Sequence, residues 1–226
     1  MSNETAPRAH STRAPSPLAH HFDDLQQQHE AGEMGMWLFL CTEIMFFGGL
    51  FLAYTIYRTH DEAAFAAASR ELDLFWGTVN TAVLLTSSLT MALAAHAAET
   101  YQKKKLIVLL TATMILGSAF IGIKGMEYHH KYVHELMPLL GLPFVWHGAS
   151  PGHAELFFDL YFLMTGVHAL HMLIGLGVML VLLGKASRGG LLGDFSAPVR
   201  ITGLYWHFVD IVWVFLFPLL YLIGAR

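Results

Sequence analysis

Long apolar stretches separated by polar segments dominate this sequence, and they predict membrane-spanning helices. Each stretch reaches the roughly 20 residues that a helix needs to cross the hydrocarbon core of a bilayer. None alternates apolar with polar positions as the roughly 10-residue strands of a membrane barrel do. The predicted fold class is therefore all-α, a polytopic membrane bundle of five transmembrane helices. The five predicted helices cover residues 35–57, 75–98, 106–126, 156–183 and 201–223.

Lysine and arginine are distributed unevenly between the two sides of the predicted helices. The positively charged side of a membrane protein normally faces the cytoplasm. We therefore predict a cytoplasmic N-terminus and an external C-terminus, in a multi-pass protein of the inner cell membrane. The N-terminal side carries eight basic residues and the other side four: Arg8, Arg13, Lys103, Lys104, Lys105, Lys185, Arg188 and Arg200 against Arg58, Arg70, Lys131 and Arg226.

The first 33 residues differ from the rest because they are polar and contain no apolar run. This composition is typical of segments that do not bury a core. We predict a flexible cytoplasmic tail over residues 1–33 and a single transmembrane domain over residues 34–226. Lys124, near the outer end of the third predicted helix, is expected to extend its ammonium group toward water.

The composition excludes several further kinds of partner and site. Hydrophobic residues make up 55% of the chain and charged residues only 13%, whereas soluble proteins have about 25% charged residues. The net charge of −4 offers no basic surplus, so nucleic acid is not a predicted partner. The single cysteine, Cys41, excludes an intrachain disulfide, a four-cysteine metal site and a dithiol redox pair.

Ionisable residues inside the apolar stretches are the strongest functional signal, because a charge at mid-bilayer costs about 2.5 to 3.5 kcal/mol or more. At a rise of about 1.5 Å per residue, Glu43 and Asp210 lie at similar depths of roughly 12 and 14 Å from the N-terminal side. Residues three apart share a helix face, which groups His168 with His171 and His207 with Asp210. A polar layer in the inner half of the bundle is expected.

Three roles stay open for Glu43, which has no polar partner on its own predicted helix. The carboxyl could carry protons or hold a lipid headgroup, or it could simply bond to a neighbouring helix.

The histidines also raise the question of a metal or a haem. The best pair for haem, His171 and His207, differs in depth by roughly 9 Å, which argues against ligation from both sides of one haem. His130 and His134 have a spacing that a metal could use on a helix. Since Pro138 follows closely, a solvated helix extension is the favoured interpretation. No cofactor-binding, metal or catalytic residue is predicted in this chain.

Several of these segments resemble subunit III of haem–copper terminal oxidases. Residues 42–51 (TEIMFFGGLF) are similar to the family's glutamate-bearing helix, and residues 80–88 open the next one. The most specific segments are 165–175 (TGVHALHMLIG) and 205–213 (YWHFVDIVW). Besides Glu43 and the four other ionisable residues, the positions that match the family pattern are Asn80, His96, Glu127 and Trp206.

The resemblance implies a subunit without its own redox centre. Haem and copper are then expected in partner subunits, and the chain is expected to sit beside catalytic subunit I of a proton-pumping oxidase that reduces dioxygen to water. Glu43 matches the family's buried carboxyl, which is associated with bound phospholipid and with sustained proton delivery. Five helices resemble the bacterial forms, which lack the first two helices of seven-helix members.

Other functions stay open at this point. Cytochrome c is the expected electron donor of the complex, with quinol as the alternative. A related accessory protein of nitric-oxide reductase is a second possibility, and a histidine-dependent transporter or haem-b protein is a third. Copurification with haem and copper distinguishes the first from the second.

Overall fold

The computed structural model describes residues 24–138 and 144–225, which form an almost entirely helical protein. Each of five helices is long and apolar enough to cross a membrane. The only β pairing within the described residues is one bridge between Leu136 and Phe144. The prediction of an all-α bundle with five spans is confirmed. The long helices are α1 (Leu25–His60), α3 (Leu74–Glu99), α4 (Lys103–Val133), α5 (Pro151–Ser187) and α6 (Ala197–Tyr221).

The helices extend beyond the predicted apolar spans. α1 already begins at Leu25, where the Asp24 carboxylate accepts a hydrogen bond from the Gln27 backbone N–H at 2.7 Å. The predicted boundary of a flexible tail at residue 33 is therefore wrong, and the remainder of that prediction, residues 1–23, lies outside the described residues. Polar residues continue a helix outside lipid because a capped end and water satisfy their backbone groups.

Three short elements lie near the ends of the bundle, and none of them was predicted: α2 and η2 connect long helices, and η3 follows α6. α2 follows α1 directly and packs Phe65 against Tyr54 and Phe157, with ring centroids 5.5 and 5.6 Å apart. Its Ser69 hydroxyl donates to the Leu220 carbonyl at 2.6 Å, which joins α2 to the end of α6. The elements are α2 (Glu62–Ser69) and the 3-10 helices η2 (Gly193–Phe195) and η3 (Ile223–Ala225).

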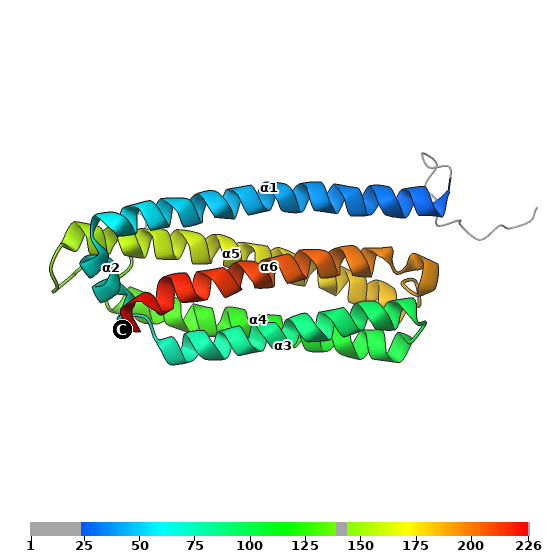
Figure 1. Ribbon diagram of the computed structural model, residues 1–226. Coiled ribbons are helices and arrows are strands. Elements are labelled where there is room, and N and C mark those ends of the chain that lie inside the picture. The colour runs from blue at the N-terminus through cyan, green and yellow to red at the C-terminus, as the bar shows by residue number, and fades with distance from the viewer. Residues whose placement is uncertain (1–23, 139–143, 226) are drawn as a thin grey trace, which may run out of the picture.

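The long helices lie nearly side by side, with α1 along one side of the bundle and the α3–α4 hairpin along the other (Figure 1). α5 and α6 run between them. We call the end at which α1 starts and α5 finishes the N-terminal end, and the end that holds α2 and the C-terminus the C-terminal end. α1 leaves large apolar side chains exposed, among them Met45 at 78%, as expected for a helix in contact with lipid.

Trp206 of α6 fixes how α4, α5 and α6 meet. A Cβ atom on Gly117 of α4 would lie 2.8 Å from the Trp206 ring, and one on Gly175 of α5 would lie 2.9 Å from it. Both positions therefore need glycine for the indole to fit. The indole N–H donates to the Ser87 hydroxyl of α3 at 3.0 Å, so this one side chain contacts all three neighbouring helices.

Candidate functional site

Glu43 of α1 meets His171 of α5 inside the apolar region of the bundle. The Glu43 Oε2 atom lies 3.1 Å from His171 Nε2, and the side chains are only 18% and 13% exposed. Phe47, one turn further along α1, packs against His171 in an edge-to-face arrangement, with the two ring centroids 5.4 Å apart. The Tyr205 hydroxyl of α6 donates to the His171 carbonyl at 2.9 Å. Glu43 therefore has its partner on another helix, and the contact joins α1 to α5.

The hydrogen bonds of His171 determine how many protons this pair holds. His171 Nδ1 lies 2.8 Å from the Val167 carbonyl oxygen, which can only accept, so Nδ1 carries a proton. The bond between Nε2 and Glu43 then contains one proton, either on the carboxyl or on the ring. A proton can move between the two groups without breaking their contact.

His207 and Asp210 do not form the direct pair that their spacing predicted. His207 Nδ1 is bonded to the Ser88 hydroxyl of α3 at 2.7 Å. Ser88 also lies beside Asp210, but the Ser88 hydroxyl group is oriented so that it bonds to His207. Both carboxyl oxygens of Asp210 are buried without a hydrogen-bond partner among the described residues. Sequence spacing missed Ser88 because it comes from another helix.

His168 and His171 share α5 but have different neighbours. His168 is fully buried, with its ring 5.5 Å from the Phe120 ring of α4 and 5.2 Å from the Trp213 ring of α6. Neither ring nitrogen of His168 has a hydrogen-bond partner within the described part of the chain. The expected polar layer thus contains two bonded pairs, Glu43–His171 and Ser88–His207, and two side chains, His168 and Asp210, without a hydrogen-bond partner among the described residues.

The remaining positions of the predicted site are spread along the bundle. Asn80 is buried in α3, and its side-chain N–H donates weakly to the Phe120 carbonyl at 3.5 Å. His96 is exposed in the last turn of α3. Trp206 has the packing role described above. Asn80 and Trp206 thus pack inside the bundle, His96 lies on its surface, and none of the three joins the group around Glu43.

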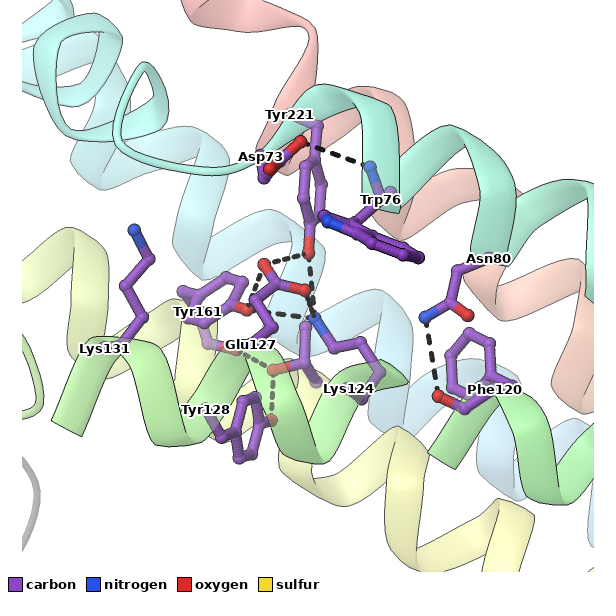
Figure 2. A network of polar contacts seen from close by, with 12 residues as sticks. Asp73, Trp76, Asn80, Phe120, Lys124, Glu127, Tyr128, Lys131, Tyr161 and Tyr221 are labelled. Carbon is purple, nitrogen blue, oxygen red and sulfur yellow. Dashed lines mark hydrogen bonds and ion pairs between the residues drawn. The ribbon is translucent and has the colours of Figure 1, made fainter. Parts of the chain in front are cut away.

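Glu127 belongs to a closed polar network toward the C-terminal end, which Figure 2 shows. The Lys124 ammonium donates to Glu127 Oε2 at 3.0 Å, to the Tyr161 hydroxyl at 2.9 Å and to the Tyr221 hydroxyl at 2.8 Å. Both tyrosines in turn donate to Glu127 Oε1, at 2.9 and 2.7 Å. All three N–H groups of the lysine are therefore used.

The expected exposure of Lys124 is wrong. Its residue surface is only 3% exposed, and its ammonium lies 4.9 Å from the Tyr161 ring centre and 5.2 Å from that of Trp213. The Glu127 carboxylate and two hydroxyl groups replace water around the charge. Sequence reasoning missed Tyr161 and Tyr221 because they lie on other helices, and only the spacing of Lys124 and Glu127 by three residues signalled the network.

His130 and His134 lie on one helix face, as predicted. Their Nε2 atoms are 3.1 Å apart at the C-terminal end of α4. The described residues contain no group of three or more histidine, cysteine or acidic side chains arranged to hold a metal. A hydrogen bond between the two rings accounts for this geometry.

Known proteins resemble this chain over nearly its whole length. A family model described as cytochrome c oxidase subunit III matches residues 149–225. Subunit 3 of the cytochrome bo(3) ubiquinol oxidase of Pseudomonas aeruginosa is 33% identical over 89% of this chain and 91% of its own length. The chain belongs to the subunit III family of haem–copper terminal oxidases.

Both branches of the subunit III family are represented among the relatives. The cytochrome c oxidase subunit 3 of Alkalihalophilus pseudofirmus is 32% identical over 85% of this chain and 86% of its own length. The quinol oxidase subunit 3 of Bacillus subtilis is 30% identical over 88% and 92%. As a subunit III, the chain is a multi-pass membrane protein of an oxidoreductase complex. The matched residues 149–225 include His168, His171, His207 and Asp210.

Proposed function

We propose that this subunit III supports proton uptake and stability of catalytic subunit I in a proton-pumping oxidase of the inner cell membrane. The Glu43–His171 pair is its proton- and lipid-associated site. The single observation that carries the proposal is the 3.1 Å contact between the two side chains, which holds one transferable proton in an otherwise apolar region. The N-terminal end of the bundle faces the cytoplasm in this proposal, in agreement with the distribution of basic residues.

In this function the chain holds no haem or copper of its own, and both belong to partner subunits. The contacts of the histidines support this assignment. Both ring nitrogens of His171 already have partners, Val167 and Glu43, and His207 Nδ1 is bonded to Ser88. His171 would therefore have to give up one of its two bonds to act as a metal ligand.

Phospholipid is the second part of the proposal at this site. An apolar groove of about 500 Å³ lies between α1 and α6, lined by Ile44, Phe47 and Phe208 among others, and Ile44 is the residue next to Glu43 along the chain. His207 also borders this groove. Its apolar walls suit an acyl chain beside the polar pair.

The electron donor of the complex has to be identified by experiment, because sequence identity does not distinguish the quinol oxidase branch from the cytochrome c oxidase branch. The cytochrome bo(3) ubiquinol oxidase relative is 33% identical and the cytochrome c oxidase relative is 32% identical. Our prediction from the sequence is cytochrome c. Oxygen uptake by the purified complex, with cytochrome c and then with quinol, decides between them. An accessory role in nitric-oxide reductase would instead leave the chain without haem absorbance and oxygen uptake.

Replacing Glu43 tests the proposed site directly. In Glu43→Ala, the complex should assemble with unchanged haem spectra, because in this function the haem and copper belong to partner subunits. Turnover should decline faster during sustained catalysis, since the proton-holding pair is lost. His171→Leu should have the same effect, because it removes the group that holds the carboxyl.

Glu99→Ala is the matched control, since Glu99 is an exposed carboxylate at the end of α3. Oxygen uptake is followed over many turnovers, together with lipid content per haem. Equal activity, lifetime and lipid content in Glu43→Ala and parent would remove Glu43 from the function.

A further inference from the structure

A mixed polar and apolar pocket of about 400 Å³ lies at the C-terminal end of the bundle, between α3 and α4 and beside the α2–α3 turn. We propose that this pocket binds the headgroup of a zwitterionic amino-phospholipid. Its phosphate is bound by Lys131 and its ammonium group by the carboxylates of Glu71 and Asp73. Trp76 and Met126 border the pocket on the lipid side.

Lys131 is the residue that most requires a ligand. It is only 3% exposed, yet its ammonium makes one hydrogen bond among the described residues, to the Glu71 backbone carbonyl. An ammonium group has three N–H donors, so two are left for another acceptor. A buried cation with unused donors is costly unless an anion or water completes its shell.

Lys124, on the same helix, differs from Lys131 in how its ammonium donors are used. Lys124 is equally buried, but its three donors all bind groups of the chain itself. In Figure 2 the Lys131 side chain stands apart from this network, with its nitrogen pointing away from Glu127. Glu127 is already occupied by Lys124 and two tyrosines, so it does not complete the shell of Lys131.

The charges around the pocket favour a headgroup that carries both signs. Arg70 and Lys131 supply two positive charges, and Glu71 and Asp73 supply two negative ones. Asp73 Oδ1 caps the start of α3 by accepting from the Trp76 backbone N–H at 3.2 Å, which leaves Oδ2 for a further donor. A purely anionic headgroup would satisfy Lys131 but would meet the two carboxylates unpaired. Phosphate and a primary ammonium together match both sets.

The position of the pocket favours a lipid over a water-soluble ligand. Asp73 caps the start of α3, and Lys131 lies in the last turn of α4, so the polar groups are at the end of two membrane spans. Trp76 and Met126, which are 43% and 69% exposed, extend the pocket onto the apolar surface. Tryptophan and lysine at this level are typical of the boundary between headgroups and acyl chains.

This site is separate from Glu43 and does not depend on the proposed function. No residue of α1 lines the pocket, and the lining residues come from the α2–α3 region and from α4. Loss of lipid here should leave the proton-holding pair intact. The two sites can therefore be tested independently.

Native mass spectrometry of the purified oxidase complex, supplied with phosphatidylethanolamine, tests the inference. Lys131→Met keeps the buried stem but removes the charge, and it should lower occupancy by phosphatidylethanolamine about tenfold, the effect of one lost charge-assisted hydrogen bond. Lys104→Met is the matched control, because Lys104 is exposed at the opposite end of α4. Its occupancy should equal that of the parent.

Glu71→Gln tests the other half of the headgroup. It removes the carboxylate that faces the ammonium group, so the preference for phosphatidylethanolamine over phosphatidylglycerol should fall while phosphate binding persists. Equal retention of phosphatidylethanolamine in Lys131→Met and parent would overturn the site.

The parent complex provides a second measurement in case Lys131→Met does not assemble. After removal of lipid, it is titrated with phosphatidylethanolamine, with phosphatidylglycerol and with inorganic phosphate. Selective uptake of phosphatidylethanolamine supports the proposal. Equal binding of both lipids, displacement by inorganic phosphate, or no uptake contradicts it.

Discussion

Two groups of buried polar side chains in this protein differ in how completely their hydrogen-bonding atoms are paired. Toward the C-terminal end, the side chains of Lys124, Glu127, Tyr161 and Tyr221 bond only to one another among the described residues, and they use every donor of the lysine. In the other group, which contains Glu43, His168, His171, Ser88, His207 and Asp210, a few pairs are bonded and other buried groups have no partner in the described chain.

This difference in hydrogen bonding distinguishes a group of side chains with a structural role from one with a functional role. A network with all donors and acceptors satisfied holds helices together and has nothing left to offer a ligand or a proton. Groups without partners cost stability, and proteins keep them where they exchange protons or meet another molecule. The closed network therefore joins α4, α5 and α6. The open group contains the bonded Glu43–His171 pair that we assign to function, together with His168 and Asp210, which have no hydrogen-bond partner in the described residues.

Breaking the closed network should have the largest effect on stability. Glu127→Ala leaves the buried Lys124 ammonium without its carboxylate and removes the acceptor of two tyrosine hydroxyls. Loss of one partner of a buried ion pair costs about 3 to 5 kcal/mol. The thermal midpoint of the purified complex, measured at one scan rate, should fall accordingly.

Glu99→Ala serves as the exposed control for Glu127→Ala, and its thermal midpoint should match that of the parent. The double variant Lys124→Met with Glu127→Ala should recover part of the loss, since no unpaired charge stays buried. If Glu127→Ala were as stable as the control, the network would not be structural.

A matched change in the open group should have a much smaller effect. Asp210→Asn keeps the shape of a side chain whose carboxyl oxygens have no hydrogen-bond partner in the described residues. We expect stability to change by about 1 kcal/mol or less, because no hydrogen bond is lost. The same thermal measurement compares it with Glu127→Ala. A loss as large as that of Glu127→Ala would show that Asp210 belongs to a second closed network.

The smallest effect on stability is expected for a change of Asp61. The Ala64 backbone N–H and the His153 side chain bond to this carboxylate and hold the pKa of Asp61 below its usual value of 3.8. A lowered folded-state pKa means that the stabilisation is present above the unfolded-state pKa and is lost as pH falls through the folded-state pKa.

Asp61→Asn should therefore reduce the thermal midpoint slightly at neutral pH and not at pH values below the folded-state pKa of Asp61. Melting curves of parent and variant over this pH range provide the measurement. Because the His153 side chain is 49% exposed and that of Asp61 20%, water weakens the contact. A pH-independent difference between the two proteins would rule out the charge as its cause.

Much of the fold could be predicted because the bilayer imposes simple requirements. Apolar length alone identified the five spans, and the cost of charge in lipid singled out Glu43 and His171, which the structure brings together. The ends of the helices were harder to predict. α1 starts at Leu25 because the Asp24 cap and water stabilise polar turns that carry no hydropathy signal.

The sequence by itself determined that this chain is a membrane bundle and which residues break the apolar rule, since both follow from local composition. Only the tertiary structure decided the partners of those residues. It surrounded Lys124 with Tyr161 and Tyr221 and bonded His207 to Ser88. Among the described residues it left Asp210 without a hydrogen-bond partner and Lys131 with one hydrogen bond. Sequence spacing reports faces of a single helix, whereas hydrogen bonds in lipid form between helices whose contacts depend on packing, such as the fit of Trp206 against Gly117 and Gly175.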